Sequence, residues 1–391
     1  MEQNIKYELA SISWDQKEIE SIYKVIGKSN YTMGELVQEF ERKFAEFNGS
    51  RYGVMVNSGS SANLLAVAAM FYKSNSSLKR GDEVIVPAVS WPTTYYPLYQ
   101  YGLKIKFVDV DKYTLNFDLD ELKKAISDKT RLIMAVNLLG NSNDYDAIKD
   151  LIKGRDIYLI EDNCESLGGE YKGKKLGTIG LMGTYSTFFS HHMSTMEGGL
   201  VLTDDEELYH ILLAIRSHGW TRHLPQQNRL CVKSKNPFEE KFRFLLPGYN
   251  VRPVEMMGAI GIEQLKKLPS FLEYRRKNAE YFKSLFLDDE RFIIQKEVGS
   301  SSWFGFSMLV NEKFGVKRSE VIEKLEKANI ETRPIVAGNF VKQEVVKWFD
   351  YEVCGDLPNA DYIDKNGFFV GNHQFDIKGR LDHLKSVLSV L

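Results

Sequence analysis

The 391-residue chain contains few cysteines and no long hydrophobic run. Its three cysteines, Cys164, Cys231 and Cys354, are far apart and odd in number, which predicts a reducing, cytoplasmic environment without structural disulfides. Three thiolates cannot complete a four-thiolate zinc or iron–sulfur site by themselves, so we expect no metal site. No stretch approaches about 18 apolar residues and residues 1–4 show no signal-peptide pattern, so we expect no membrane partner.

Net charge is nearly absent as well. The 51 basic and 53 acidic residues leave a net charge of −2, and the basic residues are spread along the chain. This excludes an electrostatic argument for a nucleic-acid partner. With 43% hydrophobic and 27% charged residues, the composition is that of an ordinary globular protein with an ample core, and the length favours two or three structural units.

What the chain does contain is a regular alternation of short apolar runs and helical segments. Expected strands cover residues 52–56, 83–87, 105–108, 132–136 and 157–160. Strands that alternate with helices predict a mainly parallel sheet, and ligands bind outside the carboxyl ends of such strands. We therefore expect the polar and aromatic residues that follow strand ends to share one pocket: Ser58–Ser60, Trp91, Asp162 and Glu165. Taken singly, Asp162 fits a helix N-cap and Trp91 a ring at the edge of the core equally well.

Residues 57–63 are small and polar, and they lie between an expected strand and an expected helix. The free backbone N–H groups and the positive end of such a helix favour an anion such as phosphate. Serine and glycine are also the commonest cap and turn residues, so this segment alone leaves both interpretations open.

A β-prone run over residues 184–189 leads into a polar turn with two histidines, and an apolar run, Leu200–Leu202, follows. This pattern predicts a strand, a turn and a second strand, with His191 and His192 on the loop, where a scaffold can aim catalytic side chains. Each histidine taken alone also fits a structural residue with a satisfied ring.

The rest of the chain supplies helices, one long loop and a second unit. Residues 14–27 have helical spacing, with apolar Ile19, Ile22, Tyr23 and Ile26. Residues 221–244 are polar and irregular, as in a substrate flap or an interface segment. Two separate helices are expected over residues 256–268 and 270–286, and a smaller α+β region follows. The predicted division is an N-terminal segment 1–30, a large cofactor-binding domain 31–269 and a small C-terminal domain 270–391.

These motifs together closely resemble the sugar aminotransferase family of vitamin B6 enzymes. The match lies in Gly34, Phe40 and Glu41 and in residues 58–64, 81–87, 161–162 and 197–199, and Asn250 and Arg333–Pro334 extend it. The resemblance implies an α/β fold of the aspartate-aminotransferase type. It also implies a large domain with a mostly parallel seven-stranded sheet and a smaller α+β C-terminal domain.

One position departs from the family pattern. The family lysine that holds the cofactor as a Schiff base lies six residues before the Glu of Glu-Gly-Gly, and this chain has His191 there. The departure points to the subgroup of keto-sugar 3-dehydratases, with His191 as the catalytic base and His192 turned away. Since imidazole cannot form a Schiff base, pyridoxamine 5′-phosphate is the expected resting cofactor, alternating with pyridoxal 5′-phosphate (PLP).

The resemblance also implies cofactor contacts. Asp162 would pair with the pyridine nitrogen, Trp91 would stack on the ring, and Glu165, where most relatives have glutamine, would lie near the ring hydroxyl. Ser186 and the backbone of Gly59 and Ser60 would hold the phosphate. Asn250 would reach the phosphate of a neighbouring subunit in a homodimer with shared active sites, and the candidate substrate contacts are His218 and Arg333.

The implied reaction removes the 3-hydroxyl of a nucleotide-linked 4-keto-6-deoxyhexose, with L-glutamate as amino donor. One dehydratase subgroup acts on a CDP-linked sugar and carries an iron–sulfur cluster, whereas another acts on GDP-4-keto-6-deoxymannose, towards GDP-colitose, without a cluster. Three dispersed cysteines favour the second. Two alternatives stay open: an aminotransferase that has lost its lysine, and an inert binding protein on the same fold.

Overall fold

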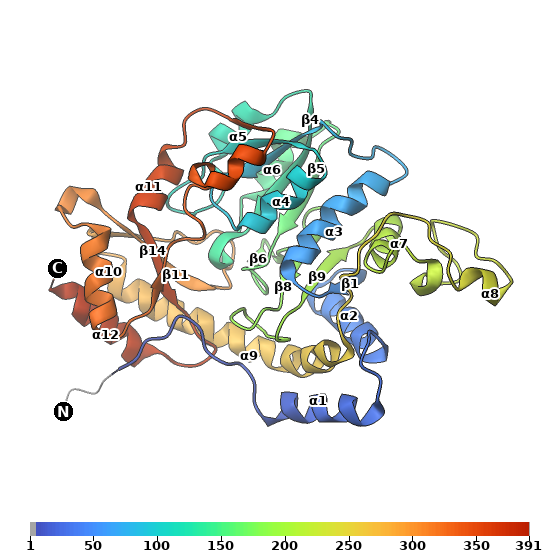
Figure 1. The fold of residues 1–391 in the computed structure, drawn as a ribbon. Helices are drawn as coiled ribbons and strands as arrows, with labels where there is room; N and C mark the ends of the chain where they lie inside the picture. The colour runs from blue at the N-terminus through green and yellow to red at the C-terminus, as the bar shows by residue number, and fades with distance from the viewer. Residues whose placement is uncertain (1–4, 391) are drawn as a thin grey trace.

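The computed structural model describes residues 5–390. Residues 1–4, which bear on the signal-peptide prediction, and residue 391 lie outside this range. Within it, the centre of the molecule is an eight-stranded sheet in the order β1-β9-β8-β5-β4-β2-β3-β13 (Figure 1). The strands are β1 (Tyr52–Val56), β2 (Glu83–Pro87), β3 (Lys104–Val108), β4 (Thr130–Val136), β5 (Tyr158–Asp162), β8 (Met182–Ser186), β9 (Gly199–Thr203) and β13 (Tyr351–Val353).

The sheet is mostly parallel, as predicted. Strand β9 pairs antiparallel with β1 and β8, and the other neighbouring pairs are parallel. The predicted number of seven strands is wrong by one. The extra strand is β13, a three-residue segment from the C-terminal part of the chain that pairs with β3, and so short a run has no apolar period that would reveal it.

Helices cover both faces of this sheet, which explains why its strands are continuous apolar runs. Helices α3 (Gly59–Tyr72), α4 (Pro92–Gln100) and α7 (Glu206–Ile215) pack on one face, with Val54, Val86 and Met134 beneath them. The other face carries α2 (Glu35–Asn48), α5 (Leu119–Ala125), α6 (Tyr145–Ile152) and α9 (Glu255–Phe286). Neighbouring strand residues alternate between the two cores, since successive side chains point to opposite faces.

Helix α9 corrects the prediction of two separate helices. It runs without interruption through Pro269, although a proline inside a helix removes a hydrogen bond and costs about 3 kcal/mol or more. Leu268 and Leu272, on either side of the proline, are buried in the core between α2 and the sheet. Tertiary packing therefore overrides the local preference. The domain boundary predicted at residue 269 falls within this helix, and the division into domains stays a prediction.

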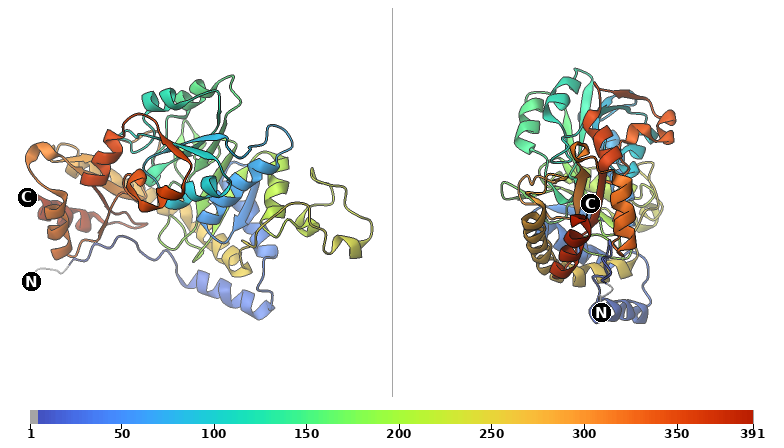
Figure 2. Two further views of the ribbon diagram at one scale, coloured as in Figure 1. Left: turned by 45° about the horizontal axis from the view of Figure 1, so that its top comes forward. Right: turned by 90° about the vertical axis from the view of Figure 1, so that its left-hand side faces the viewer.

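The C-terminal region forms a four-stranded antiparallel sheet in the order β10-β11-β14-β12. Its strands are β10 (Phe292–Ile294), β11 (Gly305–Val310), β12 (Thr332–Arg333) and β14 (Gly367–Gly371), and its helices are α10 (Arg318–Lys327), α11 (Pro358–Asn366) and α12 (Lys378–Ser389). Tyr7, near the N-terminus, is buried in the core of this region, so the first described residues run along it (Figure 2).

Three smaller features complete the fold. A hairpin of β6 (Glu170–Tyr171) and β7 (Lys174–Lys175) follows β5. The irregular segment predicted over residues 221–244 projects from the body beyond α7 and contains the short helix α8 (Pro237–Glu240) (Figure 1). Helix α1 (Gln16–Lys28) lies beside α9. None of the helices between residues 5 and 390 has the length and hydropathy that a membrane crossing requires.

Candidate active site

Asp162 is the last residue of β5, and its buried carboxylate has donors from three elements. Oδ2 accepts hydrogen bonds from Asn63 Nδ2 on α3 at 2.8 Å and from Thr94 Oγ1 on α4 at 2.7 Å. Oδ1 accepts one from the backbone N–H of Cys164 at 3.2 Å. Thr184 on β8 in turn donates to Asn63 Oδ1 at 2.6 Å. This network fixes the carboxylate at the carboxyl edge of the sheet.

The start of α3 lies against the end of β8. Ser58 caps the helix by accepting from Ser61 N at 3.1 Å, and the N–H groups of Gly59 and Ser60 lie in the first turn, where they have no partner within the helix. A Cβ added to Gly59 would come within 2.6 Å of Ser186 Cβ, so only glycine permits this approach. Two predicted phosphate contacts, Gly59 and Ser186, are therefore neighbours.

Trp91 and Ser60 lie at the same edge of the sheet. Trp91 precedes the first residue of α4, and its side chain is 57% exposed. Ser60 Oγ donates to Thr93 Oγ1 at 3.0 Å, which ties the first turn of α4 to the first turn of α3. The indole thus has an open position beside the helix end that carries the free N–H groups.

Glu165 lies three residues beyond Asp162 in a partly buried position. Its Oε2 accepts from the backbone N–H of Leu139 at 3.0 Å. Burial raises the pKa of the Glu165 carboxyl to about 7, and the nearby Asp162 carboxylate adds to the rise, while the Leu139 hydrogen bond opposes it. Near neutral pH this group therefore exchanges between a proton acceptor and a proton donor.

The two histidines lie on the loop that joins β8 to β9, as the sequence predicts. Thr195 N donates to Thr187 O at 2.9 Å and closes the loop at its base. Gly199, at the start of β9, has no room for a side chain, because a Cβ there would lie 2.3 Å from Ser58 O. The start of β9, directly after the histidine loop, and the cap of α3 are consequently held in direct contact. The predicted β-run ends early, since β8 stops at Ser186 and Phe188 and Phe189 belong to the loop.

His191 has a ring nitrogen without a partner. Its ring packs edge-on against Phe304, with centroids 5.1 Å apart, and against Phe188 at 5.9 Å. The buried Nδ1 has no hydrogen-bond partner among the described residues. Burial lowers the pKa of His191 to about 4, and the Arg275 guanidinium adds to this effect. The imidazole is therefore neutral at pH 7 and can accept a proton.

His192 is placed differently. It is 1% exposed, and its Nε2 lies 3.1 Å from the backbone oxygen of Ser302. Because a carbonyl only accepts, Nε2 carries the hydrogen in this contact. Burial, together with the Arg275 charge, holds the pKa of His192 well below its usual range. Nε2 is thus engaged by the chain itself, while the buried Nδ1 of His192, like that of His191, has no hydrogen-bond partner among the described residues.

Arg275 on α9 is a buried cation that the sequence analysis did not single out. Its Nη1 donates to the backbone oxygens of Trp303, Phe304 and Asn372 at 3.3, 3.1 and 2.9 Å. Burial lowers its pKa to about 10, so it stays charged at neutral pH. The same loop, residues 302–304, supplies the partners of both histidines.

The remaining predicted residues lie on other elements. Asn250 and His218 are exposed on adjacent segments, since Ser217 forms a bridge with Asn250, and Asn250 Oδ1 accepts from Arg252 Nε at 3.0 Å. Arg333 is exposed on β12 of the small sheet. Within residues 5–390, no hydrogen bond joins these three side chains to Asp162 or to its partners Asn63, Thr94 and Cys164. Their functional roles therefore stay predictions.

Thr94 and Thr184 were also not predicted from the sequence. Thr94 donates to Asp162 and Thr184 donates to Asn63, and both contacts depend on which helices and strands become neighbours in the fold. No group of three or more metal-ligating side chains occurs in the part of the chain that the structure describes.

Comparison with known proteins agrees with this arrangement. The sequence model of the DegT/DnrJ/EryC1/StrS aminotransferase family matches residues 13–374. A GDP-4-keto-6-deoxy-D-mannose 3-dehydratase of Yersinia pseudotuberculosis is 59% identical over 386 residues, which cover 98% of both chains. A solved GDP-4-keto-6-deoxymannose-3-dehydratase with a trapped PLP-glutamate geminal diamine has a TM-score of 0.97 and 57% identity, and the match covers 98% of this chain and 100% of that chain. A histidine-to-asparagine mutant with bound GDP-perosamine has the same TM-score, identity and coverage.

Proposed function

Because the chain belongs to the DegT/DnrJ/EryC1/StrS aminotransferase family, we propose that it is a GDP-4-keto-6-deoxy-D-mannose 3-dehydratase. The observation that carries the proposal is His191. It stands six residues before Glu197, where the family has its Schiff-base lysine, and it keeps a buried ring nitrogen unpaired. A neutral imidazole suits a proton transfer and cannot bind an aldehyde covalently as an amine does.

The residues at the sheet edge fit pyridoxamine or pyridoxal phosphate, the cofactor of the similar solved structures. The first turn of α3 with Gly59, Ser60 and Ser186 would receive the phosphate, because its N–H groups and helix dipole favour an anion. Asp162 would hold the proton on the pyridine nitrogen, and Trp91 would cover one face of the ring. When bound, the cofactor supplies an amine that condenses with the sugar 4-keto group and a ring that takes up electrons.

His191 would move the proton of the dehydration step. With a pKa of about 4 its ring is neutral at pH 7, so a ring nitrogen can take a proton from the cofactor's 4′ carbon. The resulting imidazolium would protonate the 3-hydroxyl as that group leaves as water. Phe304, whose carbonyl accepts from Arg275 Nη1 at 3.1 Å, packs edge-on against the ring and limits its movement.

The overall reaction balances with glutamate as the electron source. The sugar loses its 3-hydroxyl oxygen and gains hydrogen, while glutamate is oxidised to 2-oxoglutarate and its nitrogen leaves as ammonia. No external reductase is needed. The three cysteines lie on the loop after β5, in the projecting segment and after β13, so they do not form a joint donor set for a cluster. This favours the cluster-free subgroup.

Labelled glutamate tests the function directly. The purified protein is incubated with GDP-4-keto-6-deoxymannose, cofactor and [15N]glutamate, and the products are analysed by mass spectrometry and NMR. We expect a 3-deoxy keto-sugar and 15N-labelled ammonia. Label retained in an amino-sugar would establish an aminotransferase instead, and no turnover of either kind would favour an inert binding protein.

The homodimer with shared sites belongs to the same proposal. Helix α1 turns three large apolar residues outward, Ile19, Tyr23 and Ile26, which are 41%, 68% and 46% exposed. A second copy of the chain would cover such a stripe. The stripe continues toward the Asn250 loop, because Thr32 after α1 forms a bridge with Val254. Asn250 would then reach the phosphate of the partner, with His218 and Arg333 as substrate contacts.

Mixing two inactive variants tests the shared sites. In a dimer of an Asn250→Ala chain and a His191→Asn chain, sharing puts both defects into one site and leaves the other intact. Random mixing should then restore about one quarter of the wild-type rate. Activity that never exceeds that of the two parents would show that Asn250 does not act across the dimer.

A further inference from the structure

The loop that carries His191 is held by a distant part of the chain, the N-terminal strap, which we define as residues 13–18. Ser194 lies three residues after His191, and both of its backbone groups are bound by side chains from elsewhere. Its N–H donates to Gln264 Oε1 on α9 at 3.0 Å, and its carbonyl accepts from Trp14 Nε1 at 3.0 Å. The backbone at this point of the loop therefore depends on Trp14 and Gln264.

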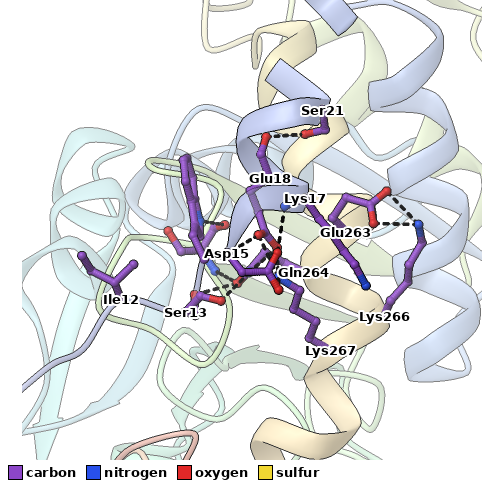
Figure 3. Close-up of polar contacts among 12 residues, drawn as sticks. Ile12, Ser13, Asp15, Lys17, Glu18, Ser21, Glu263, Gln264, Lys266 and Lys267 are labelled. Atoms are coloured by element: carbon purple, nitrogen blue, oxygen red, sulfur yellow. Dashed lines mark hydrogen bonds and ion pairs between the residues drawn. The ribbon is translucent and has the colours of Figure 1, made fainter. Parts of the chain in front are cut away.

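Gln264 is fully buried and uses all its hydrogen-bonding capacity (Figure 3). Besides the Ser194 contact, Oε1 accepts from Ser13 Oγ at 2.7 Å. Nε2 donates to Ser13 O at 3.0 Å and to Glu18 Oε1 at 2.8 Å. If the Gln264 amide were flipped, its NH₂ group would face the two donors Ser194 N and Ser13 Oγ. The orientation of this side chain is therefore fixed.

The strap is anchored by charge, not by apolar burial. Glu18 is 0% exposed, and Lys267 Nζ lies 2.7 Å from Oε1 and 2.8 Å from Oε2. Lys267 also pairs with Asp15 at 2.8 Å, and Asp15 N donates to Glu18 at 2.8 Å (Figure 3). Ion pairs and hydrogen bonds are directional, whereas an apolar contact tolerates sliding. The strap is therefore held in one position along α9, and this fixes the position of Trp14 against the loop.

We propose that Trp14 and Gln264 are positioning residues for the proton-transfer step, acting through Ser194 on the His191 loop. The inference rests on the proposed role of His191. His191 touches Phe188 and Phe304 but has no hydrogen bond from its buried Nδ1 among the described residues, so its ring is placed by these two packing contacts and by the backbone of the loop. A displacement of about 1 Å at a reacting group lowers a rate by up to about 100-fold.

Two substitutions remove the contacts while keeping most of the side-chain volume. Trp14→Phe removes the donor to Ser194, and Gln264→Met removes the acceptor. We expect each to lower kcat about tenfold with KM within about twofold, because substrate contacts are untouched. The matched controls are Trp348→Phe at a 64% exposed indole and Gln38→Met at an exposed position of α2, and both should retain the wild-type kcat.

Hydrogen exchange supplies a readout that does not need turnover. Peptides covering residues 187–198 should exchange about fivefold faster in Trp14→Phe, with peptides of β4 and β5 unchanged. If the wild type does not release ammonia, the proposed function fails, and the exchange data still test the strap. Unchanged exchange in 187–198, or equal acceleration over the whole chain, would overturn the inference. If Gln264→Met does not fold, Trp14→Phe and Ser13→Ala decide the matter.

Discussion

The Asp162 carboxylate and the loop between β8 and β9 that carries His191 are neighbours, but their hydrogen bonding differs. Asp162 ends a buried strand, and donors from α3, α4 and its own loop occupy both carboxylate oxygens. His191 lies on an irregular loop with Nδ1 unpaired, and the loop takes its support from α9 and the strap.

The two arrangements suit two different tasks, binding of the cofactor by Asp162 and proton transfer by His191. A residue that binds a fixed cofactor charge gains from fixed partners of its own, so a satisfied carboxylate suits binding. A residue that exchanges a proton needs a nitrogen that no other group occupies. His192, one residue on, also has an unpaired Nδ1, but its Nε2 is engaged by Ser302 and its side chain is 1% exposed, whereas His191 is partly exposed and within reach of a bound group.

The largest effect should come from His191→Asn. The amide has no basic nitrogen at neutral pH, so dehydration should fall roughly 100- to 10,000-fold while cofactor binding persists. Steady-state turnover and cofactor absorbance measure the two properties. His383→Asn, on α12, is the matched control and should keep the wild-type rate. Near-normal turnover of the His191 variant would assign the proton transfer to another residue.

Asp162→Asn should have the next largest effect. The amide keeps the shape but removes the charge, and its NH₂ group faces the donors from Asn63 and Thr94 in one orientation or the Cys164 N–H in the other. Loss of a charge-assisted hydrogen bond corresponds to about 10- to 100-fold in cofactor affinity. Fluorescence titration with pyridoxal phosphate measures it, with exposed Asp156→Asn as control. An unchanged affinity would remove Asp162 from the cofactor site.

Removing the Arg275 charge should change the pH dependence of the rate. Burial, with a contribution from the Arg275 charge, lowers the pKa of His191, so Arg275→Met should raise it toward its usual value of 6.5. The variant would then hold more protonated His191 in acid, and its rate at pH 5 relative to pH 7.5 should fall roughly twofold further than in the wild type. Arg275→Lys keeps the charge and should restore the profile. A profile that is the same in all three proteins would show that the charge does not act on the base.

The smallest effect concerns Glu165. Its folded pKa of about 7 exceeds the ordinary 4.5, so the folded protein holds this proton more tightly than the unfolded chain. Stability is therefore lost as the pH rises from about 4.5 to about 7. Glu165→Gln does not titrate, and its amide oxygen can still accept from Leu139. The Tm of the variant relative to wild type should be about 2–4 °C higher at pH 8 than at pH 5. An equal difference at both pH values would contradict the raised pKa.

Several elements were readable from the sequence because their signals are local. β1 and β2 occupy the predicted residues, and the two-strand setting of the histidine loop is confirmed, since apolar runs bounded by small polar residues identify buried strands. Chemistry-bearing residues that follow strand ends met at one edge of the sheet, as parallel topology requires. The family, and with it the expected cofactor contacts, was predicted from short motifs.

Other features have no local signal. The continuity of α9 through Pro269 depends on leucines packed against distant strands, and the eighth strand exists only because β3 offers it an edge. The apolar spacing of residues 14–27 predicts a helix but not which side of it is buried: Ile19, Tyr23 and Ile26 point outward and Glu18 points inward, because α9 presents Lys267 and Gln264 to this helix.

The strand-and-helix order, the parallel sheet edge and the histidine in place of a lysine can all be read from the chain without its coordinates. Each follows from residue types at short spacing. Folding in three dimensions is needed to fix which histidine binds the Ser302 carbonyl, which donors surround Asp162 and what supports the loop between β8 and β9. Those properties depend on atoms brought within about 3 Å from segments far apart in the chain, and hydrogen bonds of that length carry no sequence period.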